Sequence, residues 1–319
     1  MQFPSEKVED SSFYLELALR KSREKLRRVE LRRGTGLERK QALERQRLSY
    51  FREALTKELV RIIQSFPSLD GLNEFYTELT RATLETDSLK KGLVELHWAH
   101  KKIAELIENY RIKIKNSSNT QELQKSKQAC LGRVSSILRQ LDKPLRLMEK
   151  SRRIMRHYPL LKEGYTVAIA GFPNVGKSTL LSKLTTAKPE IKAYAFTTKN
   201  LNIGYMHKHP VRVQIIDTPG TLARFEKMNN IEKQAYLAMK YAAHVIIYVF
   251  DLTETSYPLI DQERLYESVL SLDKPVILYL SKTDLLEKEK TCDFLKKYSQ
   301  TFIDVGKLKQ KLAEQARAY

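Results

Sequence analysis

One stretch of the chain combines the residue types and the spacing that bind a phosphate chain. Residues 171–179 read GFPNVGKST and match the pattern GxxxxGK[ST] in full. Its glycines let the backbone wrap a phosphate chain with inward-pointing amides, at the N-terminus of a helix whose dipole favours anions. Lys177 is expected to reach the terminal phosphates, and the hydroxyl of Ser178 is expected to bind Mg²⁺. The predicted phosphate-binding residues are Asn174, Val175, Gly176, Lys177, Ser178 and Thr179.

A second motif, DTPG, begins at Asp217 and closes a run of apolar residues. By itself this tetrapeptide would be an ordinary turn in most proteins. At the end of a predicted strand, 40 residues after Lys177, it is more typical of a metal-linked carboxylate followed by a sensor of the γ-phosphate. Asp217 would bind the metal through water, and the amide of Gly220 would face the γ-phosphate. Between the two motifs, Thr197 and Thr198 offer hydroxyls that could close over Mg²⁺, and we prefer Thr198.

The residues that select the base are predicted to follow the apolar run 276–280, where the chain reads SKTD. The carboxylate of Asp284 can accept hydrogen bonds from N1–H and the exocyclic amine of guanine, which adenine does not present together. The stem of Lys282 can pack over the ring. The motif is similar to the NKxD signature of GTPases, with Ser281 where that signature has Asn. Because a hydroxyl is shorter than an amide, we expect this change to affect affinity more than base specificity, and Asp284 argues against an ATPase.

The elements that must position these motifs follow from hydrophobic periodicity after Gly164. Short apolar runs alternate there with amphipathic segments, which is typical of a largely parallel sheet covered by helices. The predicted strands are 165–170, 200–206, 211–216, 244–250 and 275–280. The predicted helices are 177–188, 230–243, 259–272 and 305–318. Since only residues 207–210 join the second strand to the third, those two strands should pair antiparallel.

The first half of the chain has a different period. Apolar residues recur every three or four positions between Leu48 and Phe66 and again between Leu89 and Ile114, which predicts long amphipathic helices. We therefore predict two domains: an all-α antiparallel helical bundle of about four or five helices over residues 1–160, and an α/β domain with a mostly parallel sheet over residues 161–319.

Charge adds a prediction about partners. The chain of 319 residues has a formal net charge of +19. Between Arg20 and Arg61 there are 15 basic and 6 acidic residues, and such an excess suggests a polyanion such as RNA or an acidic membrane face. The alternative is a solvated basic helix surface. The candidate RNA contacts are Arg27, Arg28, Arg32 and Arg33.

Other classes of protein are disfavoured by composition. Cys130 and Cys292 lie far apart and have no Cys or His at metal-binding spacing, so neither a disulfide framework nor a zinc site is expected. The longest apolar run, 245–250, is far too short to span a bilayer, and the N-terminus lacks a basic-then-apolar signal. We expect a cytoplasmic protein without a transmembrane segment.

The motifs in this order resemble those of P-loop GTPases of the translation-factor class. More narrowly, the chain resembles the Nog family, the nucleolar GTP-binding protein 1 type of the Obg–HflX superfamily, in an archaeal-like short form. The segments that carry the resemblance are 171–178, 194–199, 230–241 and 244–251. The resemblance implies a Ras-like GTPase domain that binds GTP, GDP and Mg²⁺ and hydrolyses GTP to GDP and phosphate. It also implies a switch in assembly of the large ribosomal subunit or its precursor, through rRNA, and we expect a monomer off the ribosome.

Two positions shape the expected hydrolysis, which we assign to Lys177, Thr198 and Gly220. Thr221 stands where Ras-type enzymes keep a water-orienting Gln, so turnover without a partner should be slow. In similar GTPases an asparagine at the position of Asn174 helps to hold K⁺, and the alternative is that Asn174 only braces the loop. Two other functions stay open: a tRNA- or translation-related GTPase, and a basic membrane-peripheral module with a nucleotide switch.

Overall fold

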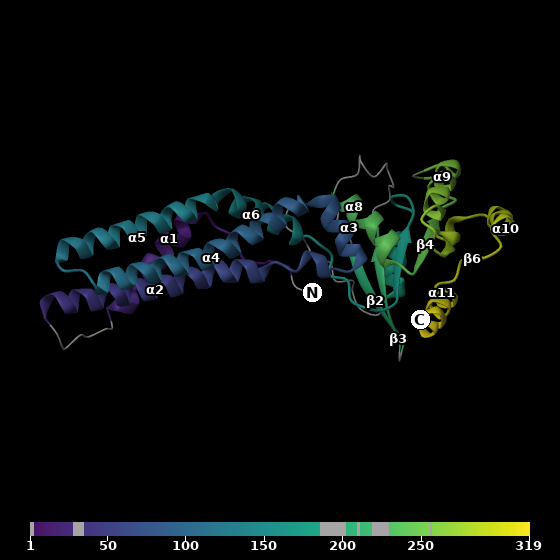
Figure 1. The fold of residues 1–319 in the computed structure, drawn as a ribbon. Coiled ribbons are helices and arrows are strands. Elements are labelled where there is room, and N and C mark those ends of the chain that lie inside the picture. The colour runs from purple at the N-terminus through teal and green to yellow at the C-terminus, as the bar shows by residue number, and fades with distance from the viewer. Residues whose placement is uncertain (1–2, 28–34, 186–201, 209–210, 219–229, 256) are drawn as a thin grey trace. The chain divides into compact units, whose positions relative to one another are not determined.

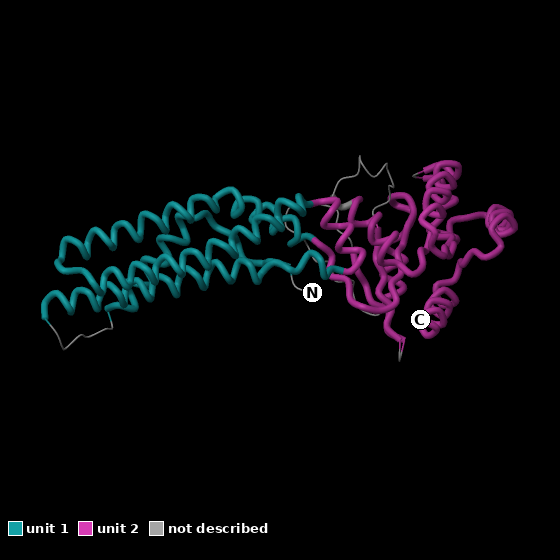
Figure 2. The backbone as a smooth tube through the Cα atoms, in the orientation of Figure 1, with its two compact units in different colours: residues 1–72, 84–157 teal, residues 73–83, 158–319 magenta. Residues whose placement is uncertain are grey.

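The computed structural model describes residues 3–27, 35–185, 202–208, 211–218, 230–255 and 257–319 (Figure 1). The chain divides into two compact units (Figure 2). Unit 1 comprises Met1–Leu72 and Leu84–His157, and unit 2 comprises Asn73–Thr83 and Tyr158–Tyr319. Residues 73–83, which lie within the predicted helical half, therefore belong to the second unit.

Unit 1 is all helical, as the periodicity predicted. Its helices are α1 (Ser11–Leu26), α2 (Gly36–Ser65), the 3₁₀ turn η1 (Leu69–Gly71), α4 (Thr86–Lys115), α5 (Thr120–Gln140) and α6 (Asp142–Met155). Helix α4 packs against α2, α5 and α6. Gly92 of α4 makes one of these approaches close, because a Cβ there would stand 3.4 Å from Pro144 Cβ of α6.

Local chemistry marks where these helices begin. The Asp10 side chain caps α1 by accepting a hydrogen bond from Phe13 N at 2.9 Å. Thr35 and Glu38 form a reciprocal capping box at the start of α2. Each such cap satisfies backbone N–H groups that have no partner inside the helix. These caps stabilise the starts of α1 and α2, and apolar packing stabilises the helices along their length.

A cluster of charged groups ties the N-terminal segment to α6. Both carboxylate oxygens of Glu149 accept hydrogen bonds from Arg152, at 2.7 and 2.9 Å, and Glu149 also accepts from Arg153 Nε and Val8 N. Burial would raise the pKa of Glu149, but these hydrogen bonds outweigh it and lower the pKa to about 2. The native state therefore holds this carboxylate in its charged form.

We predict that Glu149→Gln destabilises the bundle by about 2–3 kcal/mol at neutral pH, because Arg152 is left buried without its counter-charge. The loss is measured as a shift in the midpoint of urea unfolding, followed by the helical circular dichroism signal. Since the native pKa is depressed, the stabilisation is complete above the ordinary value of 4.5 and is lost as the pH falls towards 2. Glu105→Gln, which removes the exposed pair with Lys102, is the control and should cost under about 0.5 kcal/mol. Equal midpoints for the two variants would contradict the assignment.

Unit 2 contains a six-stranded sheet in the order β2-β3-β1-β4-β5-β6. The strands are β1 (Thr166–Ala170), β2 (Asn202–Lys208), β3 (Val211–Asp217), β4 (Val245–Phe250), β5 (Val276–Leu280) and β6 (Thr301–Phe302). Only β2 and β3 pair antiparallel, as the short connection predicted, and the other neighbours are parallel. The two-residue strand β6 was not predicted, because it is too short to show a period.

Helices cover both faces of the sheet. The helical elements of unit 2 are α3 (Glu74–Thr83), α7 (Lys177–Leu184), α8 (Asn230–Leu237) with the π-turn η3 (Ala238–Ala242), α9 (Leu259–Leu270), η4 (Thr283–Leu285), α10 (Lys288–Lys297) and α11 (Val305–Ala318). One apolar core contains residues of α7 and α11, and the other contains residues of η3, α9 and α10. Because Tyr76 of α3 donates to Pro159 O at 2.8 Å and accepts from Leu161 N at 2.9 Å, α3 is fastened within unit 2.

Candidate nucleotide-binding site

The loop between β1 and α7 requires unusual backbone geometry. Gly171 has φ +139° and Gly176, the N-cap of α7, has φ +98°. A Cβ on Gly171 would stand 2.7 Å from Val249 O of the neighbouring strand, so no other residue fits there. Asn174, at the exposed turn of the loop, has φ +65°. The backbone of the loop therefore faces the N-terminus of α7, as it does in loops that bind phosphate.

Lys177 is the buried cation of this loop. Its side chain is 7% exposed, and Nζ donates to Phe172 O at 2.6 Å. Burial lowers the pKa of Lys177 to about 8, against the opposing effect of the Asp217 charge. An anion bound in the loop would supply the counter-charge that this ammonium lacks. Ser178 and Thr179 follow on α7 with exposed side chains, and Val175 is buried beneath the loop.

Asp217 ends β3 directly beside the loop. Its Oδ2 accepts from Ser178 Oγ at 2.6 Å and from Asn202 Nδ2 at 3.3 Å, while its Oδ1 is buried and has no partner among the residues that the structure describes. A hydroxyl and a carboxylate with an unpartnered oxygen are the ligands that Mg²⁺ prefers. The residues present therefore fit the predicted metal. Asn202 has no motif around it, and sequence reasoning missed it, because only the register that pairs Asn202 with Asp217 brings them together.

The SKTD motif lies at the end of β5 and reaches the phosphate loop. Ser281 Oγ lies 2.6 Å from Val175 O and 3.0 Å from Phe250 O and donates between these two carbonyls. The hydroxyl thus braces the phosphate loop against the SKTD loop. Asp284 is exposed, as a ligand-binding carboxylate must be.

Lys282 is held by residues that the sequence motifs did not indicate. It adopts a left-handed backbone with φ +52°, and its Nζ bonds Asp251 Oδ2 at 2.6 Å. The buried side chain of Gln262 accepts from Asp251 N at 2.9 Å and donates to Asp251 O and Tyr257 O. Tyr257 in turn stacks on Phe172 with ring centroids 4.2 Å apart. Asp251 and Gln262 therefore connect the SKTD loop with the phosphate loop through α9.

We predict that Ser281→Ala weakens nucleotide binding by roughly five- to tenfold, because two buried carbonyls lose their shared donor. Ser281→Asn should bind more tightly than the natural protein, since an amide can brace the loop and also reach the base. Titration calorimetry with the same nucleotide measures both. If the two variants bind like the natural protein, the hydroxyl does not brace the loop.

Several predicted residues lie outside the described part of the chain. They are Thr197, Thr198, Gly220, Thr221, Arg28, Arg32 and Arg33. Arg27 is described, and it forms the exposed C-cap of α1. Among the described residues, no group of three or more His, Cys, Asp or Glu could hold a metal ion, and no helix has the length and apolar character needed to cross a bilayer.

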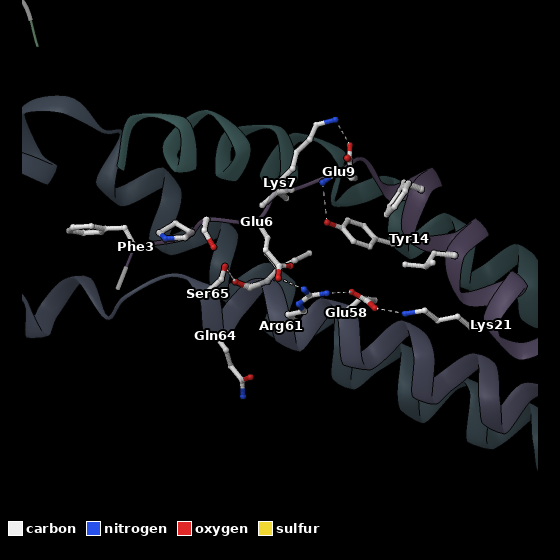
Figure 3. A pocket seen from close by; sticks show the side chains of 16 residues that line it. Phe3, Glu6, Lys7, Glu9, Tyr14, Lys21, Glu58, Arg61, Gln64 and Ser65 are labelled. Atoms are coloured by element: carbon white, nitrogen blue, oxygen red, sulfur yellow. Dashed lines mark hydrogen bonds and ion pairs between the residues drawn. The ribbon is translucent and has the colours of Figure 1, made fainter. Parts of the chain in front are cut away.

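A separate pocket of about 670 Å³ lies in unit 1, between the N-terminal segment, α1 and α2 (Figure 3). Its polar groups are already engaged with one another. Glu58 bonds Lys21 Nζ at 2.7 Å, Arg61 pairs with both Glu6 and Glu58, and Tyr14 Oη accepts from the backbone of Glu9. None of the predicted nucleotide-binding residues lines it, and the pocket lies where the N-terminal segment packs against α1 and α2.

Comparison with known proteins gives two family matches. A family model described as the NOG1 N-terminal helical domain matches residues 6–161, and one described as a 50S ribosome-binding GTPase matches residues 166–282. The "Uncharacterized protein MJ1408" of Methanocaldococcus jannaschii is 36% identical over 235 residues, which cover 73% of this chain and 66% of that protein.

Two eukaryotic relatives match more of this chain. Nucleolar GTP-binding protein 1 of Drosophila melanogaster is 32% identical over 281 residues, and that of Saccharomyces cerevisiae is 30% identical over 280 residues. Each match covers 86% of this chain and 43% of the relative. The chain thus spans about two thirds of the archaeal relative and less than half of these nucleolar proteins.

Proposed function

Because the chain belongs to the Nog family of GTPases, we propose that it binds GTP and hydrolyses it to GDP and phosphate as a switch in assembly of the large ribosomal subunit. The observation that carries the proposal is the buried Lys177 of the phosphate loop beside the Ser178–Asp217 pair, whose Oδ1 has no partner in the described part of the chain. Ser281 joins the phosphate loop to the guanine-selecting Asp284 loop through its bond to Val175 O.

Each part of the site has a separate role in this proposal. The amides of the loop and Lys177 hold the phosphates and stabilise the charge that develops on them during hydrolysis. Ser178 and Asp217 would hold Mg²⁺, which would neutralise negative charge on the phosphates. The hydroxyl of Thr198 and the amide of Gly220 are proposed to close on the γ-phosphate side, and Asp284 accepts from the guanine edge.

We propose slow turnover without a partner, below about 10⁻² s⁻¹, because Thr221 stands in place of a water-orienting Gln. Asn174 would help to hold K⁺, which would add positive charge at the phosphates, and we propose that turnover is faster in its presence. Phosphate release should therefore be several-fold faster in KCl than in NaCl at equal ionic strength, and Asn174→Ala should remove the difference. Equal rates in the two salts would exclude the K⁺ site.

The helical half is proposed to bind rRNA. It carries the larger part of the net charge of +19, with 15 basic and 6 acidic residues between Arg20 and Arg61. Neutralising phosphates releases counterions, so such binding depends steeply on salt. Arg27, Arg28, Arg32 and Arg33 remain the contacts that we propose from the sequence.

The proposed function is tested by cosedimentation with purified large ribosomal subunits. Protein loaded with a non-hydrolysable GTP analogue should sediment with the subunits, and protein loaded with GDP should sediment less. Isolated small subunits and unrelated tRNA serve as controls for general affinity for RNA. If the protein sediments with large subunits in neither nucleotide state, the proposed role in their assembly is rejected.

A further inference from the structure

Three helix ends from two distant parts of the sequence meet at one end of the unit 1 bundle (Figure 1). The first is the start of α2, the second is the end of α4, and the third is the start of α5. Gln41 Nε2 donates to Ser117 O at 2.8 Å, and Lys127 Nζ bonds Glu44 Oε1 at 2.8 Å. We call this end the bundle tip, made of residues 35–47, 111–119 and 120–127.

The bundle tip exposes basic side chains from all three helices. None of them pairs with a carboxylate among the residues that the structure describes, although Lys113 Nζ lies 5.2 Å from the centre of the Tyr110 ring. These exposed cations are Arg39, Lys40, Lys113, Lys115 and Lys125. The sequence places Arg39 and Lys40 far from the other three cations, and the bundle brings the two groups to the same end.

The acidic residues of the bundle tip are already occupied. Glu44 pairs with Arg47 and Lys127. Glu38 serves the capping box of α2, and Glu122 accepts from the backbone of Ser118 at 2.8 Å. The bundle tip holds nine Lys and Arg residues and three Glu residues, so an excess of positive charge remains at this end.

Helix dipoles explain only part of this arrangement. Lys113 and Lys115 stand in the last turn of α4, where the partial negative charge of a helix favours cations. Arg39 and Lys40 stand near the start of α2, where the partial charge is positive. Among the described residues, no carboxylate pairs with Arg39 or Lys40, and an external anion would stabilise both.

The surroundings of the cations favour a nucleic acid backbone over a membrane. The α4–α5 turn exposes Asn116, Ser118 and Asn119, whose amides and hydroxyl are types that contact phosphate and sugar. A membrane-binding surface would interleave large apolar groups with the cations. Among the described residues of the bundle tip, Ile112 is the only large apolar residue that is mostly exposed, with 53% of its surface accessible.

We propose that the bundle tip binds the phosphate backbone of structured RNA. The proposal rests on the proposed function in taking RNA as the partner, and it adds a surface assembled from α2, α4 and α5. Each cation that contacts a phosphate displaces somewhat less than one counterion from the RNA. The bundle tip thus contributes several units to the slope of log K against log salt.

The test compares two variants of the full chain that lose equal charge. The tip variant carries Arg39→Gln, Lys40→Gln, Lys113→Gln, Lys115→Gln and Lys125→Gln. The control variant changes one Arg and four Lys that are also exposed and have no carboxylate partner among the described residues, but lie outside the bundle tip. It carries Lys57→Gln, Lys91→Gln, Lys101→Gln, Lys143→Gln and Arg146→Gln. Circular dichroism and GTP binding check that both variants fold.

The probe is a fluorescently labelled RNA hairpin with a stem of about 20 base pairs, titrated at several KCl concentrations. The tip variant should bind at least tenfold more weakly than the natural protein, and its salt slope should be smaller by about 0.7–0.9 units per lost contact. The control variant should change both quantities much less. Equal losses in the two variants would show a general charge effect and overturn the proposal.

Two further outcomes separate this proposal from the proposed function. If the tip variant binds the hairpin as the natural protein does while large subunits still cosediment, the bundle tip is not the RNA surface although the function stands. If the natural protein binds vesicles of phosphatidylserine and phosphatidylcholine more tightly than the hairpin, and the tip variant loses the vesicles, the partner is a lipid surface and the proposal is overturned.

Discussion

Replacing Lys177 with alanine should weaken GTP binding by about 100- to 1000-fold. Lys177 is the buried cation of the phosphate loop, and its Nζ already lies 2.6 Å from the loop carbonyl of Phe172. Loss of a desolvated partner of a charged group costs about 2–5 kcal/mol, since the other charge is left unpaired. Titration calorimetry with GTP, and with GDP for comparison, measures the loss.

Lys183→Ala is the matched control for that substitution. Lys183 lies on the same short helix, α7, but its side chain is exposed. Its removal changes the net charge equally and should leave GTP affinity within about twofold. Full retention of binding by Lys177→Ala would show that the loop at residues 171–179 is not the phosphate site.

Replacing Asp284 with asparagine should lower GTP affinity by about 100-fold and raise the affinity for xanthosine triphosphate. The carboxylate is acceptor-only, so it suits the N1–H and amine donors of guanine. An asparagine side chain can donate instead, and xanthine presents a carbonyl oxygen where guanine carries its amine. A site built for one hydrogen-bond pattern discriminates strongly against the other, because mismatched polar groups stay unpaired.

Competition between GTP and xanthosine triphosphate, measured for the variant and for the natural protein, gives the ratio of the two affinities directly. Asp284→Ala is the control, because it should lose GTP without gaining xanthosine triphosphate. Asp293→Asn, on the exposed side of α10, should change neither affinity. If Asp284→Asn binds GTP as tightly as before, Asp284 does not read the base and the SKTD motif is not the guanine loop.

The sequence alone predicted the features that depend on neighbouring residues. The phosphate loop is contiguous, and its glycines and following helix are fixed by local backbone geometry, so its motif could be read directly. The apolar periods predicted the helical bundle and the alternating strands and helices of the second half. The four residues 207–210 between the predicted strands 200–206 and 211–216 predicted an antiparallel pair, because a connection that short can only turn the chain back.

Charge is an example of what local reasoning could not resolve. From the sequence, the 15 basic residues between Arg20 and Arg61 outnumber their local acidic partners. In the structure, several of them pair with carboxylates from distant segments: Lys25 with Glu53 at 2.8 Å, and Arg52 with Glu108 at 3.0 Å. Which cations stay unpaired, such as those of the bundle tip, therefore depends on how the helices pack.

Contacts between distant segments were decided only by the tertiary structure. Ser281 reaches Val175, 106 residues away, because parallel strands β1, β4 and β5 bring their carboxyl ends to one edge. Asn202 meets Asp217 through the register of β2 and β3, and Gln262 meets Asp251 through the packing of α9 on β4. A residue pattern encodes the period and the caps of each element. The partner that each side chain meets is decided by which elements bury their apolar faces together, and that is a property of the whole chain.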